Sequence, residues 1–122
     1  MKRTVILMFA LMALAALAVA AAATGTWKGT LETDDESREL TFDLKTDGGK
    51  LTGTVGGLLD RPLDINEGKV EGAIVTFFVI TDWDGNAVKL VYKGELAGDE
   101  IKFTMSTDDG SWSAEVRARR VA

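Results

Sequence analysis

From Thr26 onward the sequence alternates apolar and polar residues with a period of two, and glycine or aspartate interrupts the alternation at short intervals. A period of two places the apolar side chains on one face of a β-strand, whereas a helix needs spacings of three and four residues. The region after Thr26 shows no helical spacing. The pattern predicts eight strands, over residues 26–32, 38–46, 50–56, 62–71, 73–81, 86–97, 100–106 and 111–120.

Short links connect these predicted strands. Asp47-Gly48-Gly49, Gly72-Ala73 and Gly98-Asp99 are expected to form tight hairpin turns. Glu67-Gly68 is expected to be a bulge within the strand over 62–71. Consecutive hairpins form a meander, and eight antiparallel strands in sequence order can close into an up-and-down barrel without exposed edges. We therefore expect an all-β barrel. The alternative is a β-sandwich, which would need long crossover connections.

The N-terminal segment has a different character. Lys2 and Arg3 precede an apolar run over residues 5–19, and Ala18-Val19-Ala20 supplies the small residues that signal peptidase reads. These features predict a signal peptide over residues 1–23. A membrane anchor is the alternative, but the apolar run is short for a spanning helix and no cluster of Lys or Arg follows it.

Cleavage within Ala20–Ala23 would leave a single domain over residues 24–122, expected to be secreted or periplasmic. Without the two basic residues of the leader, the remaining 12 basic and 19 acidic residues give a net charge of −7. An acidic domain is not expected to bind nucleic acid or an anionic membrane. The chain has no cysteine and no histidine, and so lacks disulfides and the usual general base and metal ligand. We expect neither an enzyme nor a cofactor.

Trp27 lies near the start of the first predicted strand, and Arg120 lies at the end of the last. In a closed barrel these strands are antiparallel neighbours, and both side chains have the parity of inward-facing residues. We expect the guanidinium to lie against the indole as a cation–π contact and the pair to plug one end of the barrel.

Gly25-Thr26-Trp27, followed by the late Arg120, resembles the pattern of the lipocalins and the wider calycin group, and the chain looks most like their small secreted bacterial barrels. The segment GGKLTGTV, residues 48–55, is similar to the opening hairpins of avidin-type barrels. That resemblance implies the same eight-stranded barrel. Val55 stands where the avidin-type barrels have a tyrosine, and Lys28-Gly29 where they have Asn-Asp, so biotin binding is not expected.

The loops at the end opposite Trp27 are longer and acidic. Their carboxylates are those of Asp34, Asp35, Glu36, Asp60, Asp82, Asp84, Asp108 and Asp109. Aspartate is common in hairpin loops for backbone reasons alone, but backbone geometry does not explain Trp83 between two aspartates. We expect a shallow pocket at this mouth, suited to a small apolar or sugar-like ligand. Its predicted residues are Leu31, Leu58, Leu59, Leu63, Val79, Asp82, Trp83, Asp84 and Trp112.

The segment Asp82-Trp83-Asp84-Gly85-Asn86 superficially resembles a calcium loop. An EF-hand would need glycine at its sixth position and glutamate at its twelfth, where this chain has Ala87 and Lys93. That motif is therefore absent, and no metal site is predicted. A looser calcium site formed by several mouth carboxylates is the alternative.

The strand over 73–81 is apolar on both faces. Ile74, Phe78 and Ile80 are predicted to face outward, where they offer a surface for a homo-oligomer or another partner, unless Lys and Glu side chains of the neighbouring strands cover them. Two functions are thus expected: a non-catalytic carrier with its ligand at the mouth, or an interaction or structural module of the envelope or secretome. The module would use the outer face of 73–81 or the loop of Trp83.

Overall fold

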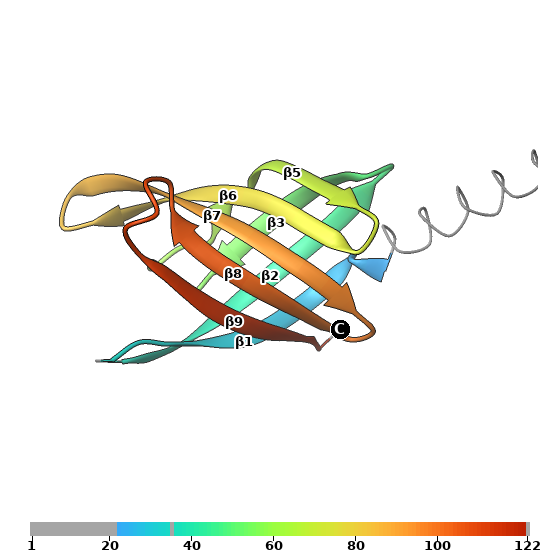
Figure 1. The fold of residues 1–122 in the computed structure, drawn as a ribbon, viewed down its shortest axis with the longest axis horizontal. Coiled ribbons are helices and arrows are strands. Elements are labelled where there is room, and N and C mark those ends of the chain that lie inside the picture. The colour runs from blue at the N-terminus through green and yellow to red at the C-terminus, as the bar shows by residue number, and fades with distance from the viewer. Residues whose placement is uncertain (1–21, 35, 122) are drawn as a thin grey trace, which may run out of the picture.

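Residues 22–34 and 36–121 are described by a computed structural model, in which the chain forms an antiparallel β-barrel (Figure 1). Residues 1–21 of the expected signal peptide lie outside the described residues. The strands are β1 (Gly25–Glu32), β2 (Ser37–Asp47), β3 (Lys50–Gly56), β4 (Leu63–Asp64), β5 (Asn66–Glu71), β6 (Ile74–Trp83), β7 (Asn86–Ala97), β8 (Glu100–Thr107) and β9 (Ser113–Arg120). Within the described ranges, no helix has the length and apolar character needed to cross a membrane.

The sheet closes on itself through its first and last strands. Trp27 of β1 lies opposite Arg120 of β9, and Gly29 lies opposite Ala118. The other neighbours follow sequence order except that β3 pairs with both β4 and β5, and every pair is antiparallel. The predicted up-and-down barrel is therefore confirmed, and its architecture is consistent with that of the calycins. The alternative of a sandwich is wrong, because each hairpin continues into the next strand of one closed sheet.

One predicted strand is divided in the structure. The strand expected over 62–71 consists of β4 and β5, which separate at Ile65, so nine strands rather than eight occur in the described residues. Asn66 lies opposite Phe78, and the next paired residue, Lys69, lies opposite Thr76. Two residues of β5 thus face one residue of β6, which confirms the bulge predicted at Glu67-Gly68. The extra residue bends the chain where β3 changes its partner: β3 pairs with β5 at Lys50 and Leu51 and with β4 at Thr54 and Val55.

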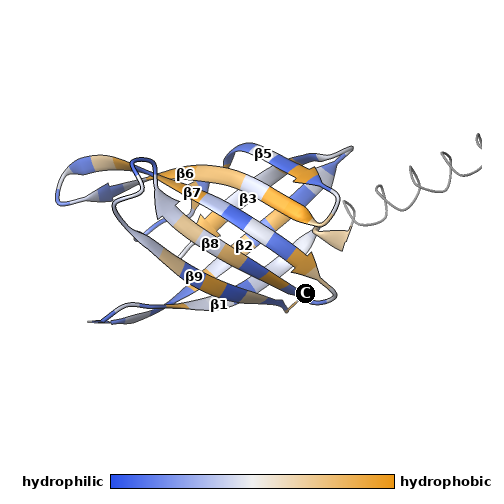
Figure 2. Ribbon diagram, in the orientation of Figure 1, coloured by the Kyte–Doolittle hydropathy of each residue, from blue (hydrophilic) through white to orange (hydrophobic). Residues whose placement is uncertain are grey.

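Apolar and polar residues alternate along most strands, whereas most of β6 is apolar (Figure 2). The buried apolar residues form one core cluster. Four aromatic side chains fill the middle of the barrel interior. Phe42 stacks on Phe103 with a ring-centroid distance of 4.6 Å, and Phe77 stacks on Tyr92 at 4.8 Å. The two stacks meet edge to face. The barrel is therefore packed at mid-height, and any ligand of moderate size has to bind at an end or on the outer wall.

Tyr92 is the single tyrosine of the chain, and its side chain is fully buried. Among the described residues its hydroxyl has no hydrogen-bond partner. Burial raises the pKa of Tyr92 well above the ordinary value of 10 because a phenolate in the core would be desolvated. An unfolded chain loses this proton near pH 10 and the folded chain retains it, so the free energy of unfolding should fall as the pH rises above about 10.

An alkaline titration tests this prediction. Phenolate absorbance should appear in the same transition as the loss of the β-sheet circular dichroism signal, because Tyr92 ionises only when the barrel opens. The variant Tyr92→Phe should unfold at a higher pH than the original protein, since its unfolded state has no phenol to ionise. Ionisation of Tyr92 near pH 10 with an intact dichroism spectrum would contradict the prediction.

Candidate binding site at the barrel mouth

The β6–β7 hairpin extends past the neighbouring strands at one end of the barrel (Figure 1). Its turn consists of Asp84 and Gly85, both of which have positive φ angles, of 54° and 82°. Two such residues form the type I′ turn that matches the twist of a hairpin. The loop expected over 82–85 is therefore shorter than predicted, and β6 continues through Trp83. The tryptophan is part of a paired strand and lies opposite Asn86.

Trp83 and Trp112 meet at the mouth. Their ring centroids are 5.6 Å apart and their planes make an angle of 87°, an edge-to-face contact. Trp83 remains 41% exposed, whereas Trp112 is half-buried. The sequence places Trp112 within a strand over 111–120, but β9 begins at Ser113 and the tryptophan ends the preceding loop. The pair thus presents an indole wall to solvent.

Hydrogen bonds hold the loop that positions Trp112. The backbone N–H of Trp112 donates to Oγ1 of Thr107 at 3.1 Å, and the N–H of Thr107 donates to the carbonyl of Trp112 at 3.0 Å. Asp109 accepts bonds from the N–H and hydroxyl of Ser111 and from the hydroxyl of Thr107. These bonds, with the N–H of Ser111 first, lower the pKa of Asp109 to about 2. The loop is therefore pre-organised around an ionised carboxylate at neutral pH.

A pocket of about 540 Å³ lies beneath the tryptophan pair. Its floor is formed by Leu90 and Met105, which are fully buried. The lining residues are Leu31, Thr33, Glu36, Arg38, Leu58, Leu59, Asp82, Trp83, Asp84, Leu90, Met105 and Trp112. A volume of this size and a mixed apolar and polar lining are typical of small-molecule sites.

The structure brings most of the predicted site residues together and leaves two elsewhere. Leu63 and Val79 are buried in the core but do not line this pocket. Leu63 lies in the short strand β4, which pairs with β3, and Val79 lies deeper in β6 than Trp83. The alternation of apolar and polar residues correctly predicts that both side chains point inward. Their position along the barrel axis depends on the stagger between strands.

Several lining residues are absent from the predicted set. The alternation predicts inward side chains for Leu90 and Met105, and both lie toward the mouth ends of their strands. Both could therefore have been predicted to line the mouth. The alternation gives no such indication for Arg38. Its guanidinium donates to the carbonyl of Leu58 at 2.7 Å and pairs with Glu36 at 3.1 Å. The side chain therefore ties the loop after β3 to the loop before β2 and places a cation at the pocket edge.

The acidic residues of the mouth are spread around it rather than gathered. Among residues 22–34 and 36–121, no group of three acidic side chains is placed to hold a metal ion. Asp35, one of the predicted mouth carboxylates, lies outside the described residues. The alternative of a loose calcium site thus gains no support from the geometry of the described part of the chain.

The opposite end of the barrel contains Trp27 and Arg120. The guanidinium carbon of Arg120 lies 4.3 Å from the ring centroid of Trp27, and the indole Nε1 donates to the carbonyl of Ala23 at 3.0 Å. Arg120 also donates to the carbonyls of Ala22 and Thr24. Trp27 is fully buried. This end is plugged by side chains and by the chain segment that enters β1.

The outer face of β6 is partly covered. Ile74 and Phe78 are half-buried, and Ile80 is 47% exposed. The ammonium of Lys89 lies 4.3 Å above the ring of Phe78. The apolar stripe expected from the sequence is therefore interrupted by a lysine at its centre.

The sequence matches no protein-family profile and no curated protein. The function of the mouth therefore has to be inferred from its own geometry.

Proposed function

We propose that this chain is an exported, non-catalytic, lipocalin-like barrel that binds a small ligand at its mouth. The observation that carries the proposal is the edge-to-face pair of Trp83 and Trp112 above a 540 Å³ pocket with an apolar floor. An exposed indole is unfavourable in water, and a hydrogen-bonded loop holds Trp112 in place before any ligand arrives.

The mixed lining favours a sugar-like ligand over a purely apolar one. The face of an indole carries negative charge density and attracts the weakly positive C–H groups of a sugar ring. Asp82, Asp84 and Glu36 supply hydrogen-bond acceptors for hydroxyl groups, and the guanidinium of Arg38 supplies donors. A purely apolar ligand would use the floor but would form no hydrogen bonds with these charged groups.

The floor of the barrel bears on the position of cleavage. The carbonyls of Ala22 and Ala23 accept hydrogen bonds from Arg120 and Trp27, which supports placing both residues in the folded domain. We propose that signal peptidase cleaves on the N-terminal side of Ala22, after Ala20 or Ala21. Cleavage after Ala23 would leave the buried N–H of Trp27 without its acceptor, which is costly.

Tryptophan fluorescence of the exported protein tests the ligand site. Cellobiose should shift the emission more strongly than toluene, because it satisfies both the indole faces and the mouth carboxylates. The variant Trp83→Ala should weaken cellobiose binding about tenfold, the equivalent of roughly 1.4 kcal/mol. Ile80→Ala is the matched control, since it removes an exposed apolar side chain from the same strand outside the pocket. Sequencing the N-terminus of the same sample checks the cleavage site.

Unchanged fluorescence with both probes would contradict the carrier function and favour the second candidate. That candidate is an interaction module of the envelope or secretome. The protruding β6–β7 hairpin supports it, because the hairpin presents Trp83 and Ile80 to solvent.

A further inference from the structure

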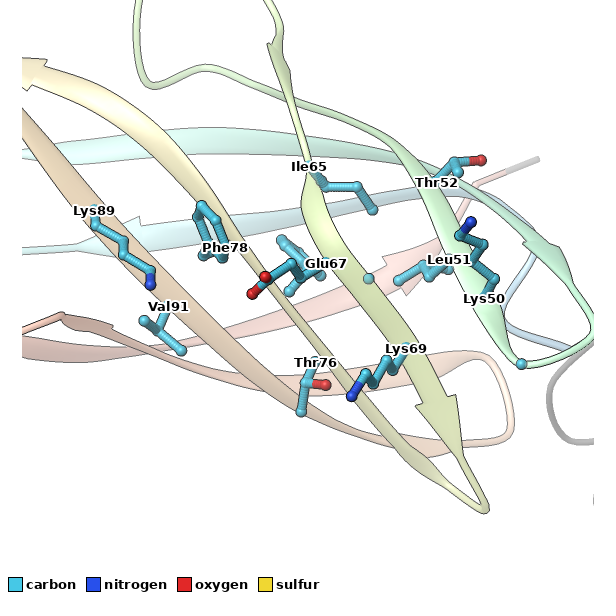
Figure 3. A pocket seen from close by; sticks show the side chains of 13 residues that line it. Lys50, Leu51, Thr52, Ile65, Glu67, Lys69, Thr76, Phe78, Lys89 and Val91 are labelled. Carbon is cyan, nitrogen blue, oxygen red and sulfur yellow. The ribbon is translucent and has the colours of Figure 1, made fainter.

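A groove of about 780 Å³ lies on the outer wall, separate from the mouth. It lies where the partner of β3 changes from β5 to β4 (Figure 3). β3 pairs with β5 only at Lys50 and Leu51, and with β4 only at Thr54 and Val55. The groove therefore exists because of the bulge in β5.

The floor of this groove is apolar and its rim is basic. Leu51, Ile65, Phe77, Phe78 and Val91 form the apolar part. Lysines from three different strands surround them: Lys50 of β3, Lys69 of β5 and Lys89 of β7 (Figure 3). In the described part of the chain, none of these three ammonium groups forms an ion pair with a carboxylate.

Two of the lysines lie on neighbouring strands that border the groove. Lys50 and Lys69 are opposite each other in the register of β3 and β5. Their ammonium groups point to different sides of the groove (Figure 3). On its other side Lys50 lies opposite Asp47 of β2. The two lysines therefore extend the positive charge along the rim, where it can attract an anion.

Glu67 is the one acidic residue that lines the groove. It has a φ angle of 51°, an unfavourable backbone conformation for a residue with a side chain. Its carboxylate faces the same groove as the three lysines (Figure 3). The local balance is thus three cations to one anion around an apolar surface, in contrast to the acidic mouth.

We propose that this groove binds an organic anion, a ligand with one sulfonate, sulfate, phosphate or carboxylate group on an apolar body. The apolar body lies on Phe78 and Ile65, and the anionic group lies at the basic rim formed by Lys50, Lys69 and Lys89. An inorganic anion would not use the floor, and a neutral apolar molecule would not use the charge of the rim. Binding at this wall is independent of the ligand proposed for the mouth.

The probe for this test is anilinonaphthalenesulfonate, whose fluorescence rises in apolar surroundings, and its neutral counterpart is N-phenylnaphthylamine. The sulfonate should bind at least about fivefold more tightly than the neutral amine, and added salt should weaken it. The double variant Lys50→Gln/Lys69→Gln should weaken sulfonate binding about fivefold, whereas Glu67→Gln should strengthen it. Lys102→Gln is the control, because it removes the same charge from β8 on another wall.

Two further measurements distinguish ligand binding at the groove from a purely structural role of the lysines and from binding at the mouth. The thermal midpoint of the double variant should be close to that of the original protein, since neither ammonium group forms an ion pair in the described part of the chain. Trp83→Ala should leave the sulfonate affinity unchanged, so failure of the mouth proposal would not affect this result. Equal affinity for both probes, an unchanged affinity in the double variant, or loss of binding in Trp83→Ala would each overturn the proposal.

Discussion

Replacing Trp27 by alanine should lower the free energy of unfolding by about 4 kcal/mol, the size expected for removing a fully buried large aromatic side chain. The indole fills the floor of the barrel, donates a hydrogen bond to Ala23 and lies under the guanidinium of Arg120. Its loss also weakens closure, because β1 and β9 pair over only three residues, including Trp27 opposite Arg120. For a domain of this size the change is a large part of the total stability.

Urea unfolding followed by circular dichroism measures this effect. Trp83→Ala is the matched control, since it makes the same substitution at a tryptophan that is 41% exposed, and it should cost about 1 kcal/mol or less. Trp27→Phe should have an intermediate cost, because it retains an aromatic ring but removes the N–H donor. A cost for Trp27→Ala no greater than that for Trp83→Ala would show that the floor does not hold the barrel closed.

Replacing Gly53 by alanine should destabilise the protein by about 3 kcal/mol or more, although only one methyl group is added. Gly53 has a φ angle of 143°, which side-chain-bearing residues rarely adopt. A Cβ atom at this position would lie 1.8 Å from the carbonyl oxygen of Asp43 on β2. Since the obstacle is backbone, β2 and β3 would have to separate, and this would also disturb the hydrogen bond from Ile65 to Gly53.

Gly72→Ala provides the control for this second prediction. Gly72 also has a positive φ angle, of 59°, but a Cβ atom added there would have no neighbouring atom within 4 Å. Its substitution should therefore cost about 1 kcal/mol, which is the cost of the left-handed conformation alone. Thermal melts of the two variants give the comparison. If Gly53→Ala were as stable as Gly72→Ala, the close approach of β2 to β3 would not constrain the barrel.

The alternation of apolar and polar residues is sufficient to predict most strands and the closed meander. It is also sufficient to match Trp27 with Arg120, because equal parity at the two ends of a barrel implies contact across the closing pair of strands. The division of the strand over 62–71 is only partly predictable. Gly68 indicates the bulge. The break at Ile65 depends on how this segment pairs with β3, and the sequence of the segment alone does not specify that pairing.

The candidate sites could also be predicted only in part. Trp83, Trp112 and the acidic loops can be assigned to one end because successive hairpins alternate between the two ends of a barrel. Leu63 and Val79 are buried but do not line the mouth pocket. Arg38 could not be predicted because its partners are carbonyls of a distant loop. The lysine groove could not be predicted at all, since Lys50 and Lys69 become neighbours only through the register of β3 and β5.

The sequence by itself determined the fold class, the inward face of each strand and the end of the barrel at which Trp83 and Trp112 lie. These properties depend on a period of two and on turn residues, which act over a few neighbouring positions. The tertiary structure alone decided which side chains share the mouth pocket, where the wall opens and which lysines face each other. These features depend on strand stagger and on one bulge, and both are set by hydrogen bonding between segments far apart in the chain.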